Sequence, residues 1–259
     1  MQYMILRRAD KGTEAGGLPV AEAARLLASL QPSASAVRLT LDHGKATVEY
    51  GPFADPAEMI AGFGIIQAES KQAAIEALRD YPASEALELE LRESGCPGGC
   101  AQIHPANVPD PKGKRFAVLL RASDALENEV PVPQVALDTL DAHNAKEAAA
   151  GVLLAADGLR TSARGARVNI AKGSFSFIDG PFTEIKEMIA GFWMIRVATM
   201  DDAIAWARRN PYPCGQYVEV EIRELFDAGA FTPELQAAEE QMRSQQLDAG
   251  LRAQFAAGR

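Results

Sequence analysis

The order of hydrophobic and polar residues along this chain predicts a series of strands and helices that occurs twice. Unbroken apolar stretches, "YMILRR" at residues 3–8 and "FAVLLRA" at 116–122, predict buried strands. Apolar and polar residues alternate in "RLTLDHGKATVEY" at 38–50 and in "RVNIAKGSFSF" at 167–177, which predicts one β-hairpin in each half. The predicted strands and hairpins therefore come in matched pairs.

Helices are predicted at two matched places. The first lies at 20–30 in one half and at 134–150 in the other. The second follows Ser70 in "SKQAAIEALRDYP" and Thr199 in "TMDDAIAWARRNP", because both residues are favoured at helix N-caps and the closing proline ends each helix. The stretches "GFGIIQA" and "GFWMIRVA" predict further buried strands, and "ALELELRE" and "YVEVEIREL" predict half-buried ones.

The two halves also share identical residues at aligned positions. "GPFADPAEMIAGF" begins at Gly51 and "GPFTEIKEMIAGF" begins at Gly180, and the alignment runs without a gap to Pro82 and Pro211. Each half gives the order strand, helix, hairpin, strand, helix, strand, which predicts an α+β fold with helices on one face of an antiparallel sheet. One domain has therefore been duplicated. We expect domains at 1–93 and 115–226, joined by a Pro/Gly-rich linker at 94–114.

The last segment, 227–259, predicts a helical tail. Thr232 and Pro233 form a typical helix start, and a loose apolar stripe follows at Leu235, Met242, Leu247, Leu251 and Phe255. The stripe fits a helix packed across the two domains or, alternatively, a helix that binds a partner.

Composition restricts the classes of function. Apolar residues make up 47% of the chain and charged residues 24%, which favours a folded protein, and the net charge of −9 disfavours direct binding of nucleic acid. The first ten residues do not resemble a signal peptide, and no apolar run is long enough to cross a membrane. The three cysteines give no disulfide framework, so we expect a cytoplasmic protein.

The segment "DGPFTEIKEMIAGFWMI", followed by "MDDAIAWA" and "VEIREL", resembles the DGPF branch of the YCII-related proteins, and residues 1–93 resemble it more weakly through "GPFADPAEMIAGF". The resemblance implies a dimeric α/β-barrel, ferredoxin-like fold in which two sheets face each other across a pocket. With two copies in tandem, one chain forms an intrachain pseudo-dimer by itself. The whole protein is then a monomer with this internal pseudo-dimer, or a homodimer. Resemblance to the wider YCII group implies a small enzyme whose pocket uses an Asp and a His. Resemblance to the DGPF branch implies a link to an extracytoplasmic-function sigma factor.

Asp179 is the first candidate catalytic residue, because it precedes Gly-Pro at a strand end where the first half has Tyr50. A buried carboxylate there could act as a general base. Alternatively, it accepts backbone N–H groups and holds the turn. His143, on the first helix of the second half, is the second candidate through the resemblance to the wider YCII group.

The candidate ligand-binding residues surround the same turn in the second half. Lys186 and Glu187 could hold a ligand or form a surface ion pair, and a carboxylate bonded to backbone donors would explain why Glu58 and Glu187 are both kept. Arg160, Arg164 and Arg167 could favour a small anion or simply be solvated. The full candidate set is Phe182, Glu184, Lys186, Glu187, Phe192, Trp193 and Arg167, with Met194 in the same apolar pocket.

No cofactor or metal is expected. Cys96, Cys100 and His104 are spaced like metal ligands, with Cys214 as a conceivable fourth, but an incidental linker explains them better. The leading hypothesis is a protein that binds a small anionic or aromatic molecule or acts in regulation, with a sigma factor as the partner that the resemblance implies. The alternative is a small-molecule lyase or isomerase with Asp179 as general base in an apolar pocket.

Overall fold

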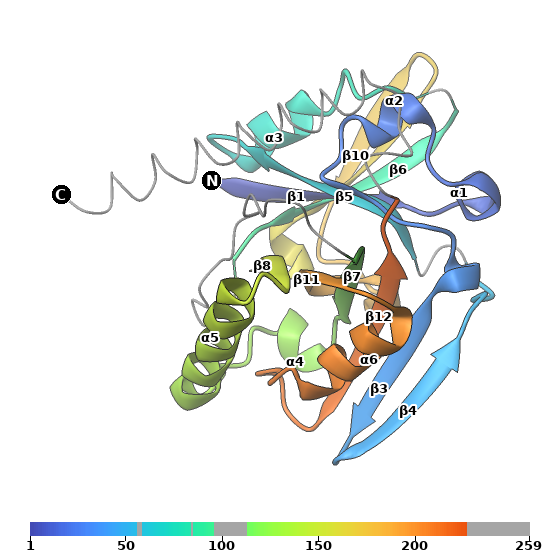
Figure 1. Ribbon diagram of the computed structural model, residues 1–259. Helices are drawn as coiled ribbons and strands as arrows, with labels where there is room; N and C mark the ends of the chain where they lie inside the picture. The colour runs from blue at the N-terminus through green and yellow to red at the C-terminus, as the bar shows by residue number, and fades with distance from the viewer. Residues whose placement is uncertain (56–58, 84, 96–112, 227–259) are drawn as a thin grey trace.

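The computed structural model describes residues 1–55, 59–83, 85–95 and 113–226 (Figure 1). The elements of the first half are β1 (Gln2–Arg8), α1 (Lys11–Gly16), α2 (Val20–Ala23), β2 (Ala28–Ser29), β3 (Val37–Asp42), β4 (Lys45–Tyr50), β5 (Ile60–Gln67), α3 (Lys71–Ala77) and β6 (Leu87–Glu93). Those of the second half are β7 (Lys114–Arg121), α4 (Asp124–Glu127), α5 (Gln134–Ala149), β8 (Leu153–Gly158), β9 (Ala166–Ala171), β10 (Ser174–Asp179), β11 (Ile189–Val197), α6 (Met200–Arg209) and β12 (Tyr217–Glu224).

The strands form two antiparallel sheets of six strands each. The first sheet has the order β10-β9-β6-β1-β5-β2, and the second has the order β4-β3-β12-β7-β11-β8. Equivalent strands of the two halves occupy equivalent places in the two orders. The α+β fold with two tandem ferredoxin-like copies, predicted from the sequence, is confirmed.

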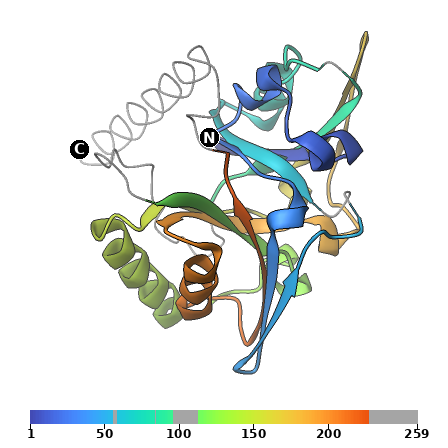
Figure 2. The ribbon, with the colours of Figure 1, turned by 45° about the vertical axis from the view of Figure 1, so that its right-hand side comes forward.

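The two halves exchange their hairpins. The β9–β10 hairpin of the second half joins the first sheet, where Val168 on β9 lies opposite Leu89 on β6. The β3–β4 hairpin of the first half joins the second sheet, where Leu39 on β3 lies opposite Val220 on β12. Figure 2 shows the β3–β4 hairpin beside β12. Each sheet is therefore completed by strands from the other half.

The layers run helix, sheet, sheet, helix. In Figure 1, α2 and α3 lie above the first sheet, and α5 and α6 lie below the second. The faces between the sheets share an apolar core in which the rings of Phe63 and Phe192 are 4.8 Å apart. Separate cores lie under the helices of each sheet.

The helix predictions have mixed outcomes. The helix at 134–150 is confirmed as α5, and Ser70 and Thr199 cap α3 and α6 as predicted. The helix predicted at 20–30 is wrong beyond α2, because Ala28 and Ser29 pair with β5 as the edge strand β2. The predicted C-terminal helix and most of the predicted linker lie outside the described residues.

Candidate functional site

Charged side chains of β6 face the space between the two sheets. The leucines of this strand, Leu87, Leu89 and Leu91, pack into the core under the helices. Because side chains alternate along a strand, Glu88, Glu90 and Arg92 lie on the opposite face. Glu90 and Arg92 are both 0% exposed, so their charges are stabilised by protein groups and not by water.

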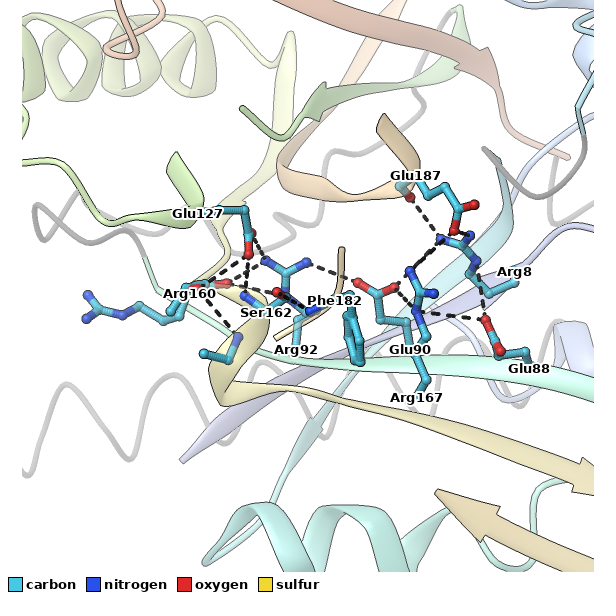
Figure 3. A network of polar contacts seen from close by, with 12 residues as sticks. Arg8, Glu88, Glu90, Arg92, Glu127, Arg160, Ser162, Arg167, Phe182 and Glu187 are labelled. Carbon is cyan, nitrogen blue, oxygen red and sulfur yellow. Dashed lines mark hydrogen bonds and ion pairs between the residues drawn. The ribbon is translucent and has the colours of Figure 1, made fainter. Parts of the chain in front are cut away.

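Arg92 is at the centre of a network that joins the two halves (Figure 3). Its Nη1 donates to Glu90 Oε1 at 3.0 Å, and its Nη2 donates to Glu127 Oε1 at 3.0 Å. Its Nε donates to the backbone oxygen of Arg160 at 3.2 Å. Both the carboxylate and the carbonyl from the second half thus face a guanidinium from the first half.

The same network occurs at the equivalent place on β12. Arg223 Nη1 donates to Glu221 Oε1 at 2.9 Å, and Nη2 donates to Glu14 Oε1 at 3.2 Å. Arg223 Nε donates to the backbone oxygen of Gln31 at 2.9 Å. The duplication of each contact indicates that this network is part of the architecture that both halves need.

Three of the predicted ligand-binding residues come together beside Glu90 (Figure 3). Arg167 Nε donates to Glu90 Oε2 at 3.2 Å and its Nη2 donates to Glu187 Oε2 at 3.4 Å. The Arg167 guanidinium lies 4.4 Å from the ring centroid of Phe182. Arg8 Nη2 also donates to Glu187 Oε2, at 2.6 Å. Arginine side chains therefore hold Glu187, and the expectation of backbone donors is corrected.

The first half keeps the counterpart of this contact. Arg38 lies 4.0 Å from the ring centroid of Phe53, and its Nε donates to Glu221 Oε2 at 3.3 Å. Glu58, the counterpart of Glu187, lies outside the described residues. Because both halves place an arginine over the phenylalanine of the turn, this feature does not distinguish the second half.

The repeated Gly-Pro-Phe turn is held by a serine. A Cβ atom on Gly180 would lie 1.9 Å from the backbone oxygen of Ser162, so only glycine allows this approach. The backbone N–H of Phe182 donates to Ser162 Oγ at 3.1 Å, and the backbone N–H of Ser162 donates to Glu127 Oε2 at 2.9 Å. Sequence reasoning missed Ser162, although Ser33 stands at the same place in the first half.

Asp179 lies on the surface, at the end of the edge strand β10. Its side chain is 56% exposed, and its Oδ1 accepts a hydrogen bond from Lys71 Nζ at 2.6 Å. The location expected for Asp179, a closed apolar pocket, is therefore corrected: the carboxylate lies beside a solvated cation, where water screens its charge.

His143 lies far from Asp179 in the fold, on α5 under the second sheet. Its ring packs 5.9 Å from the ring of Trp206, and burial lowers its pKa below the ordinary value. Among the described residues its Nε2 has no hydrogen-bond partner. Glu184 is exposed and accepts a hydrogen bond from the Thr183 hydroxyl. The side chain of Lys186 lies outside the described residues.

Phe192 and Trp193 point to opposite faces of β11. Phe192 packs on Phe63 between the sheets, whereas Trp193 belongs to the core under α5 and α6. Trp193 Nε1 donates to Asn144 Oδ1 at 3.2 Å. The expectation that Phe182, Phe192 and Trp193 line one pocket is corrected, because neighbouring residues on a strand alternate between its faces.

A cavity of 60 Å³ lies beneath α5, on the Trp193 side of the second sheet. Its walls include Leu140 and Asn144 from α5, Ala156 from β8, Trp193 from β11, and Cys214. Burial raises the pKa of the Cys214 thiol to about 11. Sequence reasoning missed Asn144, although its place on the buried side of α5 was a signal for a polar group inside the core.

Nothing in the described part of the chain groups three metal-ligating side chains together. Cys96, Cys100 and His104 fall outside that part, so the linker prediction for them stays a prediction. In the same part of the chain, none of the helices is long and apolar enough to span a membrane.

Together these features define an α+β protein of two ferredoxin-like copies, whose sheets face each other across an apolar core with a paired-charge network at each of two equivalent places. The YCII-related domain family matches residues 1–93 and 115–226, and the chain belongs to this family. A comparison with curated proteins finds no match.

Proposed function

We propose that this protein binds a small molecule through its second half, with an apolar group of the ligand in the cavity beneath α5. The cavity carries the proposal, because ligand sites are typically concave and mainly apolar, with a few fixed polar groups. Asn144 is such a group, since its hydrogen bond with the Trp193 indole fixes both side chains. A volume of 60 Å³ equals about two water molecules' share of liquid, which suits an isopropyl-sized group.

Comparison of the two halves supports a ligand site in the second half and not in the first. Where the second half has α5, of 16 residues, the first half has α2, of 4 residues. Gly64 stands where the second half has Trp193, and a Cβ atom on Gly64 would lie 3.3 Å from the Arg25 backbone oxygen and 3.4 Å from the Leu26 Cα atom. Backbone thus fills the place that a side chain and the cavity occupy in the second half.

The arginines upstream of the second hairpin give less support to an anion site. Arg160 Nη2 is 2.9 Å from Glu129 Oε2, and Arg164 Nη1 is 3.3 Å from Glu93 Oε1. Arg167 is paired as described above. An anion at these arginines would have to displace carboxylates that are already in place.

The alternative, a lyase or isomerase with Asp179 as general base, has less support than ligand binding. A general base needs a pKa and a position suited to its substrate, and Asp179 lies exposed beside Lys71. A regulatory link to a sigma factor stays a separate prediction, which co-purification of the two proteins tests.

The fluorescence of Trp193 tests the proposed site. The chain has two tryptophans, so Trp206→Phe leaves Trp193 as the single reporter in the cavity wall. We expect isobutanol, which carries an isopropyl group, to change this fluorescence with saturation in the millimolar range, as suits so small a ligand. Ala156→Val, which adds two carbons to the cavity wall, should abolish the change.

Ala142→Val is the matched control, because Ala142 is exposed on α5 and the same two carbons are added outside the cavity. This variant should respond to isobutanol like its parent. A parent without a saturable response, or an Ala156→Val variant that still responds fully, would contradict the proposed site.

A further inference from the structure

A groove of 670 Å³ lies on the outer side of the second half, where the exchanged β3–β4 hairpin passes the end of α6. His43 and Gly44 line it from the turn of that hairpin, and Arg208, Asn210 and Tyr212 line it from the end of α6 and the segment after it. The volume falls within the range of known small-molecule sites.

Three buried polar atoms lie in the wall of this groove. Asn210 is 4% exposed, and within the described residues neither its Nδ2 nor its Oδ1 makes a hydrogen bond of ordinary geometry. The Tyr212 hydroxyl is also buried without a hydrogen bond of ordinary geometry. Burial raises the pKa of this hydroxyl well above its ordinary value, and a weak side-chain hydrogen bond with Asn210, outside ordinary hydrogen-bond geometry, offsets part of the rise. Such groups are rare in folded proteins because burying them without a partner is costly.

The same segment is the outer wall of the cavity beneath α5. The Tyr212 ring meets the Trp193 ring edge-on, with centroids 5.4 Å apart, and Pro213 and Cys214 line the cavity. We call residues 210–216 the wall segment. It contains no helix or strand, and Gly215 has φ +99°. A shift of this segment toward the groove would connect the two spaces and uncover its polar atoms.

We propose that the groove and the wall segment hold the polar end of the ligand, and that this end is a carboxylate. The inference rests on the proposed function, which places the apolar end in the cavity. With the wall segment open, the Asn210 amide and the Tyr212 hydroxyl donate to the carboxylate. Arg208, which is exposed and has no ion pair among the described residues, supplies the charge. The ligand class is a small branched-chain or similar apolar carboxylic acid.

The first half has different residues at the equivalent places. Tyr81 stands where the second half has Asn210, and its hydroxyl donates to the backbone oxygen of Glu22 at 3.3 Å. Ala83 stands where the second half has Tyr212. These buried polar atoms, which lack a hydrogen bond of ordinary geometry, therefore belong to the half that has the cavity.

Three probes separate the two ends of the ligand, with Trp193 fluorescence in the Trp206→Phe protein as the readout. Isobutanol has the apolar group and a hydroxyl, isobutyrate has the apolar group and a carboxylate, and acetate has the carboxylate with one methyl. We expect isobutyrate to bind about tenfold more tightly than isobutanol, as one or two added charge-assisted hydrogen bonds allow, and acetate to bind more weakly than either.

Tyr212→Phe is the decisive variant, because it removes the hydroxyl and keeps the ring against Trp193. It should lose about tenfold in affinity for isobutyrate and nothing for isobutanol, and it should unfold at nearly the same temperature, because the hydroxyl loses only a weak contact with Asn210. Tyr217→Phe is the control, since that exposed hydroxyl donates to Glu219 and lies outside both spaces.

The outcomes separate this inference from the proposed function. Isobutanol binding without any preference for isobutyrate, or a Tyr212→Phe variant that binds isobutyrate like its parent, overturns the carboxylate site and leaves the cavity site standing. Failure of all three probes to bind overturns both.

Discussion

At the scale of single residues, the closest backbone approach in the repeated turn is at its glycine. A Cβ atom on residue 180 would lie 1.9 Å from the Ser162 backbone oxygen, and one on residue 51 would lie 1.8 Å from the Ser33 backbone oxygen. Both neighbours are backbone atoms, which cannot rotate away. We expect Gly180→Ala to lower the free energy of unfolding by about 3 kcal/mol, as forced overpacking does, and urea denaturation measures it.

Gly16→Ala is the control for that substitution. Residue 16 lies at the end of α1, and a Cβ atom there meets nothing within 4 Å. The variant should keep or slightly raise the stability of the parent protein, because alanine favours the helix. Equal losses in the two variants would show that the approach to Ser162 is not what requires glycine.

His143 makes stability depend on pH. Burial lowers its pKa below 6.5, and Lys146 and Arg209 lower it further, whereas Glu147 acts in the opposite direction. In the pH range between the folded pKa and 6.5 the unfolded chain binds more protons at this site, so acidification through that range weakens folding. We expect His143→Gln to lose less stability between pH 8 and pH 5 than the parent in thermal unfolding.

The other two histidines of the chain, His43 and His104, are present in both proteins, so they do not distinguish the variant from its parent. A His143→Gln variant that loses as much stability on acidification as its parent would contradict the role of burial at this residue.

At the scale of elements, the sequence predicted helices correctly where no distant strand pairs with the same residues. The pattern at 134–150 gave α5, and the N-cap residues gave the starts of α3 and α6. The pattern at 20–30 failed because Ala28 and Ser29 form ladder pairs with β5. Pairing between distant strands overrode the local helical preference there, and local patterns carry no information about such pairing.

The candidate site shows the same limit. Phe182 and Glu187 were found because the turn around them is repeated, and Arg167 was found as one of the arginines upstream of the second hairpin; the three do meet. Asn144 was missed because its importance comes from a hydrogen bond to Trp193 on another element. The sequence analysis predicted Phe192 and Trp193 in one pocket as neighbouring apolar residues. Neighbouring residues on a strand point to opposite faces of the sheet, so the two side chains lie apart.

At the scale of the whole molecule, the hairpin exchange makes the two halves depend on each other. The alternating letters of β3–β4 and β9–β10 predicted both hairpins, but they fit the edge of either sheet equally well, so the exchange could not be foreseen. In the structure β9 pairs with β6 over five residue pairs, from Leu87↔Ile170 to Leu91↔Ala166. The Arg92 and Arg223 networks add contacts between the halves at equivalent places.

This dependence predicts the behaviour of a divided chain. Residues 1–95 and 113–259, expressed together as separate chains, should co-purify as a one-to-one complex, because each half leaves a sheet edge and buried charges unpaired without the other. Size-exclusion chromatography with light scattering measures the stoichiometry. Deleting residues 37–50 from the first chain is the control and should weaken the complex, since it removes the hairpin that pairs with β12. Two halves that elute as separate folded monomers would show that each copy completes its own sheet, contrary to the exchange.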